Sequence, residues 1–145
     1  MHSARVQSSG NIRQYMTIRS AWKLAGGLLI GVTIFFWLIP LPSAQSPANL
    51  DKLVHGAVFA LLMLWFVQIT RRHRWAALAL ALTLLGISLE LAQGAGGYRT
   101  FSYLDIAANT VGIALGWISA LLGLSSILTR LETVLAIHNT RRSTP

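Results

Sequence analysis

Four long apolar stretches constrain the fold of this chain more than any other feature of its sequence. They lie at about residues 21–41, 53–70, 75–93 and 103–124, and short polar segments separate them. Each has close to the ~20 residues that an α-helix needs to cross ~30 Å of hydrocarbon. The backbone polar groups of an isolated span must bond within that span in lipid, so these spans have to be helices. We therefore expect an all-α, polytopic membrane protein built around a four-helix transmembrane bundle.

Composition excludes several other classes of protein. Charged residues make up only 11% of the chain and the mean hydropathy is +0.57, whereas a water-soluble domain is about one quarter charged. The chain has no cysteine, which excludes disulfides and thiolate metal sites. It also has no P-loop and no glycine-rich dinucleotide fingerprint. We assign it no cofactor and no metal from the sequence, and a carboxylate and imidazole metal site enters only with the enzyme hypothesis below.

The distribution of Lys and Arg predicts how the spans are oriented. Segments 1–20, 71–74 and 125–145, together with Lys23, hold all but two of the 12 basic residues, and the exceptions are Lys52 and Arg99. Basic residues favour the cytoplasmic side, so both termini are expected in the cytoplasm, with the first and third loops facing outward. A basic surface interrupted by apolar spans is not the continuous face that nucleic acid requires, so we expect no nucleic-acid partner.

The segments outside the spans carry two further predictions. Residues 1–20 are interpreted as a flexible, basic cytoplasmic tail; a cleaved signal peptide is disfavoured because the basic region is long and Pro42-Ser43-Ala44 is a poor cleavage site. After the fourth span, apolar residues recur at helical spacing, which predicts an amphipathic helix along the inner membrane surface. An extension of the fourth span is the alternative. The apolar positions are Leu124, Ile127, Leu128, Leu131, Val134 and Leu135.

Three of the predicted helices carry polar residues at ends that this topology brings to one depth. Pairs spaced i,i+3 or i,i+4 share a helix face, and small residues continue the polar face of the fourth span, where they allow close packing in lipid. That stripe consists of Asp105, Asn109, Gly112 and Gly116. The candidate binding residues are Asp51, Lys52, His55, Glu90, Gln93, Arg99, Ser102, Asp105 and Asn109.

Several of these residues also have purely structural interpretations. Asp51 and Ser102 could be helix N-caps, and Ser102-x-x-Asp105 fits a capping box. Lys52 could extend to the headgroups, and His55 could be a packed histidine with one hydrogen bond.

Glu90 is harder to explain in that way. It follows a long apolar run near the end of a helix, where an anion opposes the helix dipole. Charge within the bilayer is costly unless it is paired. We therefore expect Glu90 to bond to Arg99 or His55 within a shared cluster, although a structural ion pair is the alternative.

Three short motifs resemble those of the VanZ-like membrane proteins. "DKLVH", "ELAQ" and "YRTFSYLDIAANTVG" are similar to that family's Asp-Lys-x-x-His, Glu-x-x-Gln and Arg-x-x-Ser-x-x-Asp-x-x-x-Asn-x-x-Gly boxes. The matching positions are Asp51, Lys52, His55, Glu90, Gln93, Arg99, Ser102, Asp105, Asn109 and Gly112. The resemblance covers about residues 49–124 and implies a protein of the bacterial inner membrane and cell envelope. The family takes its name from a protein associated with low-level resistance to teicoplanin, and no defined reaction comes with the family.

Four functions are compatible with these residues. In the first, the outward-facing site binds the head group of a lipid-linked glycan precursor or a related anionic membrane lipid, with Arg99 and Lys52 on phosphate and Asn109 and Gln93 on sugar or amide groups. In the second, the protein is an enzyme on such a lipid. In the third, it is a small proton-coupled transporter with Glu90 as the titrating group. In the fourth, it is a structural partner of other membrane proteins.

The enzyme hypothesis names its own residues. His55 with Asp51 could act as a general base and Glu90 as an acid. A divalent metal held by these three residues and Asp105 would also suit carboxylate and imidazole ligands. The sequence contains no nucleophile motif that would strengthen this hypothesis.

Overall fold

The protein is entirely helical over the residues that the computed structural model describes, which are 2–39, 48–97 and 100–142. The long helices are α1 (His2–Leu38), α2 (Ala48–Val67), α3 (Trp75–Ala95), α4 (Tyr103–Leu121) and α5 (Ile127–Arg142), and short 3₁₀ turns form η1 (Arg72–Arg74) and η2 (Leu124–Ser126). Four segments are long and apolar enough to cross a membrane: Ile18–Leu38, Leu50–Val67, Arg72–Ala95 and Tyr103–Leu121. The predicted fold class is therefore confirmed.

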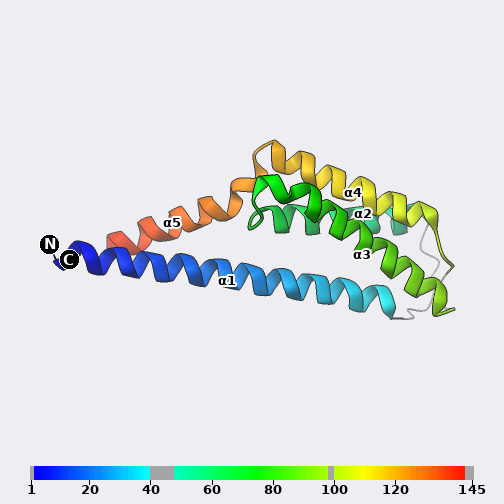
Figure 1. The fold of residues 1–145 in the computed structure, drawn as a ribbon, viewed down its shortest axis with the longest axis horizontal. Coiled ribbons are helices and arrows are strands. Elements are labelled where there is room, and N and C mark those ends of the chain that lie inside the picture. Colours follow the sequence, from blue (N-terminus) through cyan, green and yellow to red (C-terminus); the bar gives the residue numbers. More distant parts are fainter. Residues whose placement is uncertain (1, 40–47, 98–99, 143–145) are drawn as a thin grey trace.

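The four spans alternate in direction, as short connections between them require. α2, α3 and α4 form a tight cluster, and α1 runs along it and continues well past its end (Figure 1). The loop at 71–74 thus lies at one end of the bundle, which we call the basic end. The starts of α2 and α4 and the end of α3 lie at the other end, which we call the polar end.

Glycines bring α2 and α4 into backbone contact. A Cβ atom added at Gly112 would collide with the backbone of Gly56, and one added at Gly116 would lie 2.6 Å from the carbonyl oxygen of Ala60. The buried residues of α4 are Asp105, Asn109, Gly112, Ile113, Gly116 and Ala120. The predicted stripe therefore faces the bundle, and it carries Asp105 and Asn109 inward with it.

A pair of tryptophans fixes α1 against α2 toward the basic end. The rings of Trp22 and Trp65 stack with centroids 4.0 Å apart. Each indole N–H donates to the other residue's backbone carbonyl at 3.2 Å. Gly26 leaves room for this contact, since a Cβ there would lie 2.9 Å from Trp65 Nε1. The contact holds α1 beside α2, where both helices can contribute to one site.

Two predicted boundaries need correction. Residues 2–20 do not form a flexible tail, because α1 is one continuous helix from His2 to Leu38. No proline occurs in that range to interrupt the hydrogen-bonding of the first span. Helix α2 begins at Ala48 rather than at about residue 53, so Asp51 lies in its first turn and is not its cap.

The C-terminal segment forms a separate helix. Gly123, with φ of 109°, breaks the chain direction between α4 and η2, which excludes an extension of the fourth span. The Gln68 side chain joins this segment to α2: its Nε2 donates to Leu124 O at 2.7 Å and its Oε1 accepts from Leu128 N at 3.2 Å. Helix α5 then projects from the bundle on the side of α1 (Figure 1), where Glu132 pairs with Arg19 of α1. Its position on the membrane surface stays a prediction.

Candidate functional site

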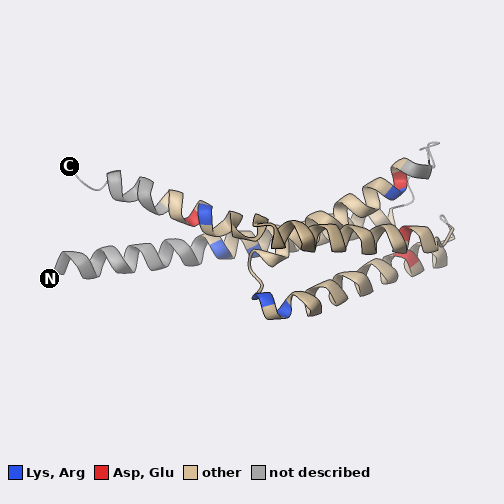
Figure 2. Ribbon diagram, turned by 90° about the horizontal axis from the view of Figure 1, so that it is seen from above, with Lys and Arg blue, Asp and Glu red and all other residues tan. Residues whose placement is uncertain are grey.

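Acidic residues of three helices gather at the polar end, far from the arginines of the 71–74 loop (Figure 2). His55, Glu90, Gln93, Asp105 and Asn109 are all buried there, each no more than 2% exposed. Asp51, Lys52 and Ser102 are partly buried. The structure thus brings together eight of the nine candidate residues, and Arg99 lies outside the described residues.

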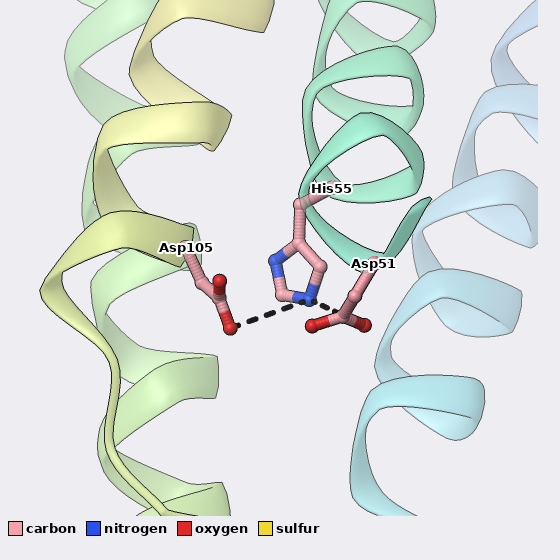
Figure 3. A group of neighbouring side chains, drawn as sticks. All are labelled: Asp51, His55 and Asp105. Atoms are coloured by element: carbon pink, nitrogen blue, oxygen red, sulfur yellow. Dashed lines mark ion pairs between the residues drawn. The ribbon is translucent and has the colours of Figure 1, made fainter. Parts of the chain in front are cut away.

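His55 lies between two carboxylates (Figure 3). Its Nε2 is 3.9 Å from Asp51 Oδ1, one turn earlier on α2, and 4.0 Å from Asp105 Oδ2 on α4. The close approach of α2 and α4 at Gly56 and Gly112 sets the second distance. On its other side the imidazole packs against Trp37 of α1, with ring centroids 4.8 Å apart. The histidine is therefore held in place by three helices.

The two oxygens of Asp105 face different side chains. Lys52 Nζ lies 3.4 Å from Asp105 Oδ1, and His55 is on the Oδ2 side. Lys52 is about one third exposed, so its ammonium group reaches from the surface to a carboxylate that is almost fully buried. A ligand at the polar end would therefore meet Lys52 and Asp51 before the buried residues.

Ser102 confirms one half of the predicted capping box and alters the other. Its side chain caps α4 by accepting from Asp105 N at 3.3 Å. In a complete box, the acid three residues on would accept the Ser102 backbone N–H. That N–H instead donates to Glu90 Oε1 of α3 at 2.6 Å. Glu90 thereby gains a backbone donor and Asp105 is left to face Lys52 and His55.

The Ser102 N–H is a hydrogen-bond partner of Glu90 that the sequence did not predict. The sequence indicates side-chain partners, Arg99 and His55 above all, whereas any residue except proline can supply a backbone donor. The bond also helps explain how an anion is tolerated near the end of α3, because Ser102 N–H is a donor at the start of a neighbouring helix.

A cavity of about 410 Å³ opens between α1 and α2 and reaches the polar end. Its walls are mostly apolar, with Leu29, Val32, Phe36, Val54, Val58 and Leu61 among them. Asp51, His55 and Gln93 line it as well. The residues from Leu29 to Trp37 span roughly 12 Å of helix at ~1.5 Å per residue. The cavity is therefore an elongated apolar groove with polar groups towards one end.

Helix α1 contributes to the site although the sequence of its span predicted no site residue. Gln93 Nε2 donates to the backbone carbonyl of Trp37 at 2.8 Å, which ties α3 to α1. The sequence marks Trp37 only as an aromatic residue near the end of a span, which is a common interfacial position. Its role beside His55 and Gln93 was therefore not predicted.

Two buried amides at the polar end retain hydrogen-bonding capacity. Asn109 packs beside Gly86 of α3, and neither its Oδ1 nor its Nδ2 has a hydrogen-bond partner among the described residues. Gln93 Oε1 has none within the same part of the chain. Buried polar atoms of this kind are costly unless something pairs with them. They can hydrogen-bond a ligand or a bound water.

The chemistry of the site is that of a partly desolvated group of mixed charges. The carboxylates of Asp51 and Asp105 lie around His55, and Asp105 also faces Lys52. The third carboxylate, Glu90, is buried on α3 and accepts from Ser102 N–H. Such a site can bind a polar head group, exchange a proton through His55 or coordinate a cation.

Comparison with known proteins gives one match. The sequence model of the family described as VanZ/LLP1 matches residues 4–124, which include all four spans and every candidate site residue. No curated protein and no solved structure gives a significant match.

Proposed function

Because the chain belongs to the VanZ/LLP1 family, we propose that it is a bacterial cell-envelope protein that binds an anionic lipid or the head group of a lipid-linked glycan at its polar end. It is a multi-pass membrane protein with four apolar helices. The proposal places it in the inner membrane with both termini cytoplasmic, since this orientation keeps most Lys and Arg inside. The polar end then faces outward, where envelope lipids carry their glycan groups.

The groove between α1 and α2 is the observation that carries this proposal. Its apolar walls lie among membrane-spanning segments and its polar residues lie at the end of the spans. A lipid has the same division, with an apolar chain joined to a polar head. The chain gains no transfer free energy from water there, because it comes from the bilayer, and close van der Waals packing against the groove walls holds it. The head then lies beside Asp51, Lys52 and His55.

Lys52 and two buried amide side chains support recognition of the head group. The ammonium group of Lys52 is partly exposed and can meet phosphate as a point charge. The Gln93 oxygen can accept from a sugar hydroxyl, and the Asn109 amide can both donate and accept.

Lipid co-purification tests the proposal. The protein is extracted from bacterial membranes into native nanodiscs, and the retained lipids are identified by mass spectrometry. Leu61→Trp is expected to fill the groove and lower the amount of the enriched lipid several-fold. Leu80→Trp is the matched control, because Leu80 is also an exposed leucine within a span but does not line the groove. Lys52→Gln should reduce the preference for anionic over zwitterionic lipids. Equal lipid profiles for wild type and both tryptophan variants would contradict the proposal.

The second candidate is an enzyme acting on the same lipid. The observation in its favour is His55 Nε2, which lies about equally far from two carboxylates and could accept a proton while they stabilise its charged form. Incubation of the purified protein with lipid-linked glycan should then release a soluble head group, and His55→Gln should abolish the release. The transporter alternative has less support, because the described polar cluster lies at one end of the bundle.

A further inference from the structure

The gap between Asp51, His55 and Asp105 has the size of a metal ion. One oxygen or nitrogen from each residue lies within 4.8 Å of the other two. The distances from His55 Nε2 to the two carboxylates, 3.9 and 4.0 Å, are too long for hydrogen bonds, which measure about 2.7–3.2 Å. A cation bonded at ~2.0–2.2 Å separates opposite ligands by up to about 4.4 Å. Shifts of less than about 1 Å would bring all three atoms into coordination.

We propose that Asp51, His55 and Asp105 form a binding site for a divalent transition-metal cation. One imidazole nitrogen and two carboxylates suit Zn²⁺ or Mn²⁺ better than Mg²⁺ or Ca²⁺, which favour oxygen ligands alone. The three ligands come from two helices that glycines hold in backbone contact, so the site is preorganised. Asp51 is about 31% exposed and gives the ion a path from the surface.

Lys52 is placed to orient the Asp105 carboxylate from outside the proposed metal site. Lys52 lies 3.4 Å from Oδ1 and leaves Oδ2 facing His55. Metal-binding carboxylates are commonly oriented by a second interaction of this kind. With Lys52 included, the Asp51, His55 and Asp105 cluster has a net charge of about −1 when the histidine is neutral, so it attracts a cation.

A second observation points to a ligand at the same place. Gln93 is 2% exposed and lines the cavity that Asp51 and His55 also line. Its Nε2 donates to Trp37, and its Oε1 accepts no hydrogen bond from the described residues. An amide oxygen in this position can accept from a water molecule bound to the cation. The cavity that Gln93 shares with Asp51 and His55 thus contains a buried acceptor for such a water.

Such an ion would also make the polar end more receptive to phosphate. The described carboxylates repel an anion, and a divalent cation between two of them would reverse the local charge. This link to lipid rests on the proposed function, whereas the cation site does not depend on it.

The test uses metal alone, without lipid. The full chain is purified in detergent, its affinity tag is removed, and it is treated with a chelator. ZnCl₂ is then titrated by calorimetry and the bound metal is counted by mass spectrometry. One Zn²⁺ per chain is expected, and Co²⁺ in its place should give a visible absorption band of a coordinated ion. Asp51→Asn should weaken binding at least 10-fold; it is the preferred variant because Asp51 is partly exposed and the chain should fold without its charge.

His73→Ala is the matched control, since His73 is an exposed histidine of η1 at the basic end. Its loss should leave the affinity for Zn²⁺ unchanged. His55→Gln and Asp105→Asn should each abolish binding if circular dichroism shows them folded. No saturable binding by wild type, or equal binding by wild type and Asp51→Asn, would overturn the cation site. Either result would leave the groove and its lipid assay untouched, so the two proposals can fail separately.

Discussion

At the level of single residues, a backbone N–H group stabilises a buried carboxylate at the polar end. Glu90 is 1% exposed and Asp105 is 2% exposed, although charge is expensive in a bilayer. Ser102 contacts both residues, since its hydroxyl accepts from the backbone N–H of Asp105 and its own N–H donates to the Glu90 carboxylate. One serine therefore caps α4 and orients a carboxylate of α3.

We predict that the acceptor oxygen of residue 90, more than its charge, supports folding. Glu90→Ala removes the acceptor of the Ser102 N–H and leaves a partly buried donor unpaired, which costs about 1–3 kcal/mol. Glu90→Gln keeps an oxygen at that place and should lose less. Thermal unfolding in detergent, followed by circular dichroism, measures both. The idea fails if Glu90→Gln is as unstable as Glu90→Ala.

At the level of helices, contact between α2 and α4 determines the distance from His55 to Asp105. Gly56, the residue after His55 on α2, touches Gly112, which lies about two turns after Asp105 on α4. A change in that contact should therefore alter both the stability of the bundle and the distance between His55 and Asp105.

We predict that Gly112→Leu destabilises the bundle by at least about 1–3 kcal/mol, the usual cost of overpacking. The new side chain would meet the backbone of Gly56, which cannot rotate away as a side chain can. Ala114→Leu is the control, because Ala114 is an exposed residue of the same helix. Unfolding temperatures of the two variants decide the matter, and similar values would show that α4 does not depend on its small-residue face.

The joint between α2 and α5 gives a separate prediction. Gln68 bonds to Leu124 O and to Leu128 N, and Glu132 further along α5 pairs with Arg19 at 3.0 Å. Gln68→Leu should increase amide hydrogen exchange in 127–142 while exchange in α3 stays the same. Mass spectrometry of the exchanged protein measures both segments. Unchanged exchange in α5 would mean that the Arg19 contact alone holds it.

At the level of the whole molecule, the sequence predicted what depends on periodicity and composition. The four spans follow from apolar length, and the inward face of α4 follows from the spacing of Asp105, Asn109 and Gly112. Capping is one of two interpretations that the spacing to Asp105 offers for Ser102, and the structure shows the cap. Contacts to backbone groups could not be predicted in the same way. The hydrogen bonds from Ser102 N–H to Glu90 and from Gln93 to Trp37 O depend on how the helices pack. The identity of a residue does not encode that packing.

The orientation of the whole molecule is the remaining prediction, and the absence of cysteine makes it directly testable. The basic end should face the cytoplasm, because translocating the arginines of the 71–74 loop is unfavourable. Thr100 and His73 are exposed residues near opposite ends of the spans. In intact bacterial cells whose outer membrane admits the reagent, a membrane-impermeant maleimide should label Thr100→Cys at once and His73→Cys only after the inner membrane is permeabilised. The reverse pattern would place the groove and its polar residues on the cytoplasmic side, where a lipid carrying an outward-facing glycan could not reach them.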